Sequence, residues 1–147
     1  MDASIPAREA LRTLQENHDS ASVIFVVEKQ NDGILQCLEA FPSGTDWADI
    51  LARLPGTVPA YLLSRFMIED RREHIISRRP VDIGVIWCPA RMPALAKARL
   101  PTYTPPVMKF VGAISEWFEA STAADLEYPT VYARAWKHAP ASWKTVS

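Results

Sequence analysis

Apolar residues along this chain form two kinds of pattern, continuous runs typical of strands and spaced stripes typical of helices. The runs at residues 22–28 and 60–68 are rich in β-branched, aromatic and leucine side chains, and they predict internal strands. The run at residues 82–88 contains IGVIW, which is apolar on both faces, and Pro89 ends it. We therefore expect residues 82–88 to form a central strand covered on both sides.

These runs have partners nearby in the sequence, which predicts antiparallel hairpins. Residues 31–33 read Asn-Asp-Gly, a strong turn signal, and stand between the run at 22–28 and an apolar run at 34–41. The two later strands are joined by the charged segment EDRREHIISRRP, residues 69–80. This segment predicts a second, longer hairpin with a protruding, arginine-rich tip.

Amphipathic stripes predict two helices in the first part of the chain and a small helix near its end. Residues 6–17 place alanine and leucine on one side, and residues 45–54 do the same with tryptophan, isoleucine and leucine before Pro55-Gly56. A short strand is expected at residues 117–121. Thr122, with an aspartate three residues later, resembles a capping box for the last helix, which continues toward Trp136.

The best-marked helix is predicted to begin after Thr104, a good N-cap, and to continue to residue 116. Prolines follow Thr104 at the first helical positions, where a missing N–H costs nothing. One stripe of this helix is apolar and is expected to face the core, whereas another side is expected to face away from it. The inward stripe is Val107, Phe110, Val111 and Ile114, and the outward residues are Met108, Lys109 and Gly112.

This order of elements predicts one α/β domain, with a central mixed, mostly antiparallel sheet of five to six strands and helices on both faces. The domain is expected to cover residues 1–139, and residues 140–147 form a tail without periodicity. A chain of 147 residues fits one such domain.

Composition and charge exclude several classes of partner. The formal net charge is −1 and the sequence pI is near 6.3, so the chain as a whole has no attraction to nucleic acid. No apolar run is long enough to span a membrane, and the N-terminus is too charged for a signal peptide. We expect a cytoplasmic protein that is monomeric.

Candidate catalytic and metal-binding residues are sparse. Cys37 and Cys88 are far apart in the sequence and lie in apolar runs, which indicates buried reduced thiols. The three histidines form no pair at metal-ligand spacing, and no serine has the flanking glycines of a nucleophile elbow. We therefore expect no metal, no cofactor and no enzymatic activity.

Basic residues gather at two places. One group brackets the tip of the second hairpin, and Lys97-Ala98-Arg99 forms a basic connector before the best-marked helix. Two interpretations stay open at this point: the groups are ordinary surface charges, or they contact an acidic partner. The first group is Arg71, Arg72, Arg78 and Arg79.

Three segments together resemble the actin-depolymerising-factor homology family, which includes cofilin, coactosin and glia maturation factor. Residues 83–89, IGVIWCP, resemble the family strand that ends in an aromatic residue, a small residue and proline. Residues 93–100, PALAKARL, with Tyr103 beyond them, resemble the family segment rich in lysine. The helix ending FVGAI before Ser-Glu-Trp resembles the family helix and its following strand. The resemblance covers nearly the whole chain and implies a gelsolin-like fold.

The resemblance also implies two binding surfaces and no catalysis. The surface for an actin monomer would consist of Ser4, Ile5, Lys97, Arg99, Met108, Lys109 and Gly112. The surface for filaments would consist of Arg71, Arg72, Arg78, Arg79 and Arg134. Phosphoinositides would compete weakly for the basic surfaces. A protein of this kind belongs to the cytoskeleton and has actin or actin-related proteins as partners.

One departure from the family pattern concerns the best-marked helix. It opens with Thr104-Pro105-Pro106 in place of two serines, and it carries one lysine in place of several. Fewer charges predict weaker monomer binding, because each exposed ionic contact contributes little. The main hypothesis is regulation of filament depolymerisation and turnover. A glia-maturation-factor-like protein that removes branches is a second hypothesis, and a non-actin adaptor or small enzyme is a third.

Overall fold

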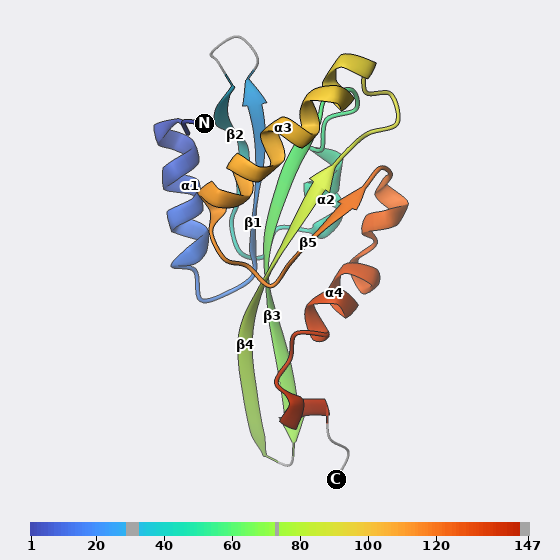
Figure 1. The fold of residues 1–147 in the computed structure, drawn as a ribbon. Coiled ribbons are helices and arrows are strands. Elements are labelled where there is room, and N and C mark those ends of the chain that lie inside the picture. The colour runs from blue at the N-terminus through green and yellow to red at the C-terminus, as the bar shows by residue number, and fades with distance from the viewer. Residues whose placement is uncertain (29–32, 73, 145–147) are drawn as a thin grey trace.

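A computed structural model describes residues 1–28, 33–72 and 74–144 and shows an α/β fold around a single sheet (Figure 1). The order of helices and strands agrees with the order predicted from the sequence. The elements are α1 (Ile5–Gln15), β1 (Ala21–Glu28), β2 (Ile34–Phe41), α2 (Trp47–Ala52), β3 (Ala60–Arg72), β4 (Ile75–Trp87), α3 (Ala94–Val111), β5 (Glu116–Ala120), the 3₁₀ turn η2 (Ala123–Leu126), α4 (Tyr128–Trp136) and the 3₁₀ turn η3 (Ala141–Lys144).

The sheet has five strands in the order β2-β1-β3-β4-β5. Neighbouring strands are antiparallel except β4 and β5, which are parallel. Both predicted hairpins are confirmed, because β1 pairs with β2 and β3 pairs with β4. The Asn31 and Asp32 of the predicted first turn lie outside the described residues. The prediction of a mixed, mostly antiparallel sheet is confirmed with β4 as an internal strand.

Alternating side chains of the central strands build two cores, one on each face of the sheet. On β1, Phe25 faces the core under α1 and α3, and Ile24 faces the core under α2 and α4. Both side chains are fully buried. Because each face of the sheet is covered by helices, the apolar runs at β1, β3 and β4 show no polar alternation, as the sequence indicated.

Gly84 in β4 makes room for an aromatic side chain on the α1 and α3 side. A Cβ atom built on Gly84 would lie 2.4 Å from the ring of Trp117, its partner on β5. Trp117 in turn meets the buried Tyr61 edge to face, with ring centroids 6.4 Å apart. The glycine of the IGVIW run therefore allows Trp117 to lie flat against the sheet.

Strands β3 and β4 are longer than predicted, and their distal half projects beyond the rest of the sheet (Figure 1). The register continues to Arg72 opposite Ile75. Turn η3 lies beside this projection, where the Arg72 guanidinium donates to the Trp143 carbonyl and the rings of Trp136 and Trp143 are 5.9 Å apart. Part of the predicted tail therefore packs against the domain.

The prediction for the longest helix was wrong at both ends. It begins at Ala94, ten residues before Thr104, and it ends at Val111. Thr104 lies inside the helix, where its hydroxyl donates to the Leu100 carbonyl at 2.8 Å and lies 2.9 Å from the Tyr61 hydroxyl. Lys97 and Arg99 are consequently helical and do not form a connector. Three prolines lie within the helix, namely Pro101, Pro105 and Pro106.

Packing explains why the helix tolerates these prolines, each of which removes a backbone donor. One stripe of α3 contacts the sheet over the whole helix, with a spacing of three or four residues. Most helical stability in proteins comes from such packing rather than from local propensity. The stripe consists of Ala96, Leu100, Thr104, Val107 and Val111.

Candidate actin-binding surfaces

The outward face of α3 is exposed along its length and lies on the same side of the molecule as α1 (Figure 1). Its most exposed line contains small and neutral residues rather than a row of lysines. Lys109 is the basic residue on this line and is exposed, as predicted. The line consists of Ala98, Pro101, Thr102, Pro105 and Lys109.

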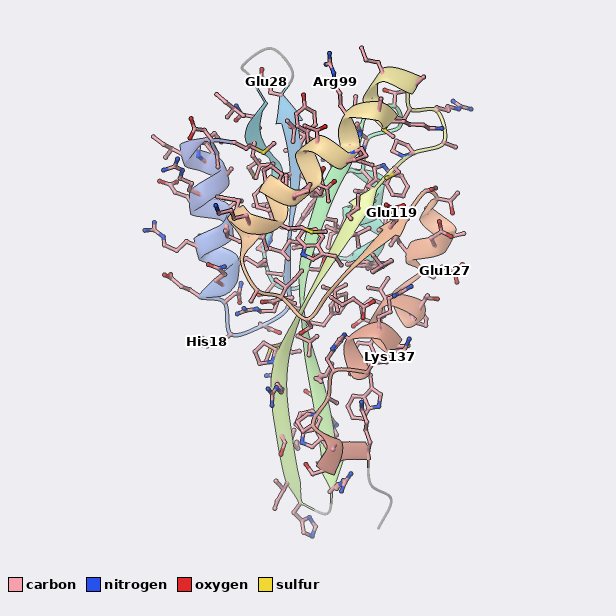
Figure 2. The ribbon with its side chains drawn as sticks, viewed as in Figure 1. His18, Glu28, Arg99, Glu119, Glu127 and Lys137 are labelled. Carbon is pink, nitrogen blue, oxygen red and sulfur yellow. The ribbon has the colours of Figure 1, made fainter. Side chains whose placement is uncertain are left out.

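Lys97 and Arg99 lie on opposite edges of α3 rather than in one basic patch. Lys97 and Arg99 are two residues apart in the helix, so their side chains point about 200° apart around the helix axis. Lys97 borders a hollow of about 400 Å³ that Cys88 and Ser121 also line. Arg99 is half-buried and projects from the upper end of α3 (Figure 2). A partner must therefore cover the width of the helix to contact both.

The other candidate residues on α3 differ from one another in what they contact. Met108 was predicted to face outward, but it is half-buried and packs against the core under α1 and α3. Gly112 is exposed and ends the helix with φ of 85°, and its N–H donates to the Met108 carbonyl at 3.0 Å. Since a positive φ favours glycine, Gly112 has a structural role in addition to any contact with a partner.

Ser4 and Ile5 are held at the start of α1. The Ser4 hydroxyl accepts a hydrogen bond from the Ala7 N–H at 3.2 Å and caps the helix, and the Ser4 N–H donates to the Leu35 carbonyl at 2.9 Å. Ile5 is 72% exposed. The far end of α1 contacts α3, where the Gln15 amide donates to the Val111 carbonyl. Ser4 is therefore about 16 Å, the length of α1, from that contact.

The arginines of the second predicted surface are largely engaged within the hairpin. The Glu69 carboxylate forms ion pairs with Arg71 at 2.9 Å and with Arg78 at 3.2 Å. On the other face of the hairpin, Arg72 pairs with Asp70 at 3.0 Å. Among the described residues, Arg79 has no acidic side chain within ion-pair distance. The tip is therefore rich in arginine, as predicted, but its charges are mostly compensated locally.

Arg134 lies on α4, away from the hairpin end, and fastens α4 to β5. Its guanidinium pairs with Glu116 and lies 4.0 Å from the centroid of the Phe118 ring. His138 Nε2 is 2.9 Å from the other oxygen of Glu116. Burial would raise the pKa of the Glu116 carboxyl, but hydrogen bonds from His138 and Arg134 and their charges outweigh burial and lower it.

Two exposed isoleucines at the end of the hairpin were not predicted as site residues. Ile75 is 69% exposed and Ile76 is 59% exposed. In the sequence they stand inside a charged segment, and adjacent strand residues face opposite sides, so both cannot reach one core. Two adjacent isoleucines inside a charged hairpin segment could therefore have predicted an exposed apolar tip.

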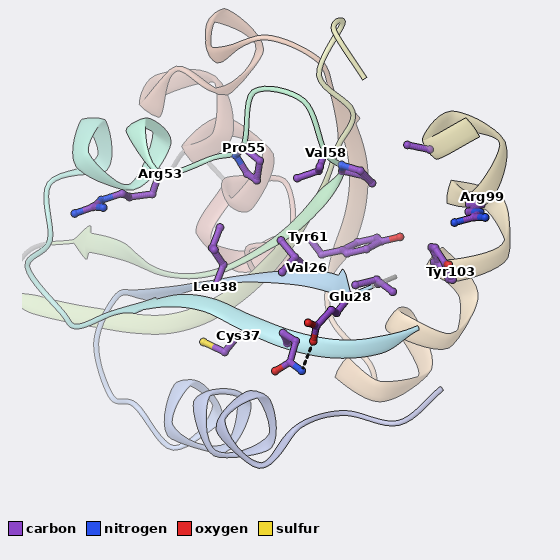
Figure 3. Close-up of a pocket in the computed structure, with 14 residues that line it drawn as sticks. Val26, Glu28, Cys37, Leu38, Arg53, Pro55, Val58, Tyr61, Arg99 and Tyr103 are labelled. Carbon is purple, nitrogen blue, oxygen red and sulfur yellow. Dashed lines mark hydrogen bonds between the residues drawn. The ribbon is translucent and has the colours of Figure 1, made fainter. Parts of the chain in front are cut away.

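A cavity of about 870 Å³ lies between β1, β2, the segment before β3 and the first half of α3 (Figure 3). Its walls are mainly apolar, with Val26, Leu38 and Val58 among them. Its polar groups are partly paired with each other, since the Gln36 amide donates to Glu28 at 3.0 Å. Burial, and then the charge of Glu39, raises the pKa of the Cys37 thiol, which opposes thiolate formation.

The cavity also has polar and titratable groups on its wall, namely Glu28, Cys37, Tyr61 and Tyr103. Among residues 1–28, 33–72 and 74–144, no three metal-ligating side chains gather at one place. In that same part of the chain, no helix is long and apolar enough to cross a membrane.

Comparisons with known proteins give one matching family model and several similar folds. The model of the cofilin/tropomyosin-type actin-binding proteins matches residues 1–135. Human coactosin-like protein has a similar structure, with a TM-score of 0.76 and 16% identity over 93% of this chain and 98% of that chain. Cofilin from Streptomyces griseoflavus gives a TM-score of 0.73 and 16% identity over 92% and 96%.

Glia maturation factor from Caenorhabditis elegans is similar at a TM-score of 0.68 and 11% identity, over 90% of this chain and 94% of that chain. A search among curated proteins found no match. At these identities the solved structures establish the fold, whereas the family model covers most of the sequence. The chain therefore belongs to the cofilin/tropomyosin-type actin-binding family, the actin-depolymerising-factor homology family that the sequence resembles.

Proposed function

We propose that this protein binds actin monomers and the sides of actin filaments and regulates filament depolymerisation and turnover. The observation that carries this proposal is the match of the actin-binding family model to residues 1–135. The exposed side of α3, with Lys97 at one edge and Lys109 on its outer line, offers the monomer surface. The projecting hairpin and α4 offer the filament surface. The protein acts by binding, without catalysis, as a cytoplasmic monomer.

The exposed side of α3 has few charges, so we expect moderate monomer affinity and weak binding of phosphoinositides. Lys97→Ala combined with Arg99→Ala removes a cation from each edge of the helix. Each exposed charge contributes roughly 0.2–1 kcal/mol, so the double variant should bind monomers about two- to thirtyfold more weakly. Titration of labelled actin monomer measures this change.

Lys137→Ala is a matched control, because Lys137 is an exposed cation at the C-terminal end of α4, which packs on the opposite face of the sheet from α3. It should bind monomers like the wild type. Wild-type protein that binds neither actin form at concentrations of tens of micromolar contradicts the proposed function.

A second candidate function is removal of filament branches by binding the branch-nucleating complex of actin-related proteins, as in glia maturation factor. The low charge of the α3 surface favours this candidate, because it reduces attraction to the actin monomer. A debranching assay separates the two functions. Branch loss by a protein that binds no monomer supports the second candidate.

A further inference from the structure

The end of hairpin β3–β4 exposes an apolar tip, which we define as Ile75 and Ile76. Ile75 pairs with Arg72, and Ile76 pairs with Arg71. Since neighbouring strand residues point to opposite faces, each face of the hairpin ends in one isoleucine. Single exposed apolar residues are common on proteins. Two adjacent isoleucines, 69% and 59% exposed at the end of a projection, are a more specific arrangement.

The charges beside the apolar tip are mostly satisfied inside the protein. Arg71 and Arg78 share Glu69, and Arg78 also lies 3.6 Å from Asp19. Arg72 contacts Asp70 and the Trp143 carbonyl. In the sequence, residues 69–80 contain four arginines and three acidic residues, a formal charge of +1. The hairpin therefore has little surplus charge with which to hold an anionic lipid surface.

The projection is supported by contacts along its length. Strand pairing is continuous from Ala60 opposite Trp87 to Arg72 opposite Ile75. The bond from Arg72 to Trp143 ties the distal part of β3 to η3, which packs on Trp136 of α4 (Figure 1). A preorganised projection loses little conformational freedom on binding, so burial of its apolar end is translated into affinity.

We infer that the apolar tip inserts into an apolar recess on the side of the actin filament, and that this contact, rather than the hairpin arginines, supplies most of the hairpin's contribution to filament affinity. This inference rests on the proposed function. Apolar burial is proportional to area and insensitive to ionic screening, whereas arginine contacts weaken with salt. The two kinds of contact can therefore be distinguished by substitution and by salt.

The first test replaces both isoleucines, as Ile75→Thr with Ile76→Thr. Threonine keeps the β-branched shape that suits a strand but exposes a hydroxyl. Co-sedimentation with filaments should weaken by at least about tenfold, given the area of two isoleucine side chains. Leu38→Thr is the matched control, because Leu38 is a 47% exposed aliphatic residue of β2, away from the hairpin. It should sediment like the wild type.

The second test uses Arg71→Gln with Arg78→Gln, whose binding should fall by less than about twofold because both arginines are already paired. Wild-type affinity should change by less than about threefold between about 50 and about 200 mM salt. Unchanged binding by the threonine variant, with loss in the glutamine variant, overturns the inference. Wild-type binding to phosphatidylserine vesicles that the threonine variant loses also overturns it. Wild-type protein that ignores filaments contradicts the filament-binding proposal itself.

Discussion

The outer face of α3 and the end of hairpin β3–β4 are both candidate contact surfaces, but their charges behave in opposite ways. The helix has few cations, and among the described residues neither Lys97 nor Lys109 has an acidic side chain within ion-pair distance. The hairpin has four arginines in residues 69–80, and three of them are paired with Glu69, Asp70 or Asp19. The hairpin therefore carries more cations than the α3 face, but a smaller share of them is unpaired and available to a partner.

The two surfaces also depend on different supports. The α3 face rests on the core that contains Tyr61, Trp117 and Val107, so its geometry follows the packing beneath it. The hairpin end lies beyond both cores and depends on strand pairing and on its bond to η3. Substitutions in the core should therefore affect the helix surface more than the tip.

Gly84→Ala should have the largest effect, because a single methyl group at this position would lie 2.4 Å from the Trp117 ring. Trp117 and Tyr61 lie beneath α3, so relief of the clash must displace its support. We expect a loss of about 2–4 kcal/mol in the free energy of unfolding. Urea denaturation measures it. Gly56→Ala is the control, since nothing lies within 4 Å of a Cβ there. Equal stability of both variants contradicts this account of the α3 support.

Local patterns predicted the strands well because apolar runs report burial on both faces of a sheet. The runs later seen as β1, β3 and β4 were correct in type and order. The start of α3 was missed because prolines at 105 and 106 indicate a helix N-terminus locally. The stripe from Ala96 to Val111 decides the outcome instead, and it contacts a sheet that local patterns do not place.

The candidate surfaces were predicted in part. Resemblance to the family indicated which segments to consider, and α3 is indeed exposed on its outer side. The pairing of Arg71 with Glu69 could have been foreseen, because residues two apart on a strand share a face. The contact of Arg78 with the same glutamate required the register, in which Arg78 lies opposite Glu69. That register brings distant charges together and reduces the basic character of the tip.

Pro105→Ala should stabilise α3 and leave the hairpin unchanged. Pro105 is exposed in the interior of α3 and removes the N–H that would bind the Pro101 carbonyl. Alanine restores this donor, and we expect a gain of about 1–3 kcal/mol in the free energy of unfolding, measured by urea denaturation. Pro42→Ala is a control outside any helix and should give no such gain. A loss of stability in Pro105→Ala contradicts the position of this residue within the helix.

Substitution of Glu116 should have the smallest effect on stability. Because Glu116 binds Arg134 of α4, which lies beside the hairpin, the attachment of α4 to the sheet should depend on pH. Burial raises the pKa of its carboxyl, but His138 and Arg134 outweigh this and hold the folded-state pKa below the ordinary value of 4.5. A depressed carboxyl pKa stabilises the folded state above the ordinary value, and this contribution disappears as pH falls through the lower, folded-state pKa. Thermal unfolding midpoints should therefore decrease over that acidic range.

Glu116→Gln removes the titrating group and keeps its shape, so it should be less stable than wild type at neutral pH, and the difference should narrow below about pH 4.5. Glu119→Gln, an exposed carboxylate on the same strand, is the matched control and should leave the midpoints nearly unchanged. Equal midpoints of Glu116→Gln and wild type across this range would mean that the bond network of Arg134 and His138 depends on the shape of this side chain rather than on the charge of Glu116. In that case the hairpin and α4 would share with the α3 face a dependence on packing alone.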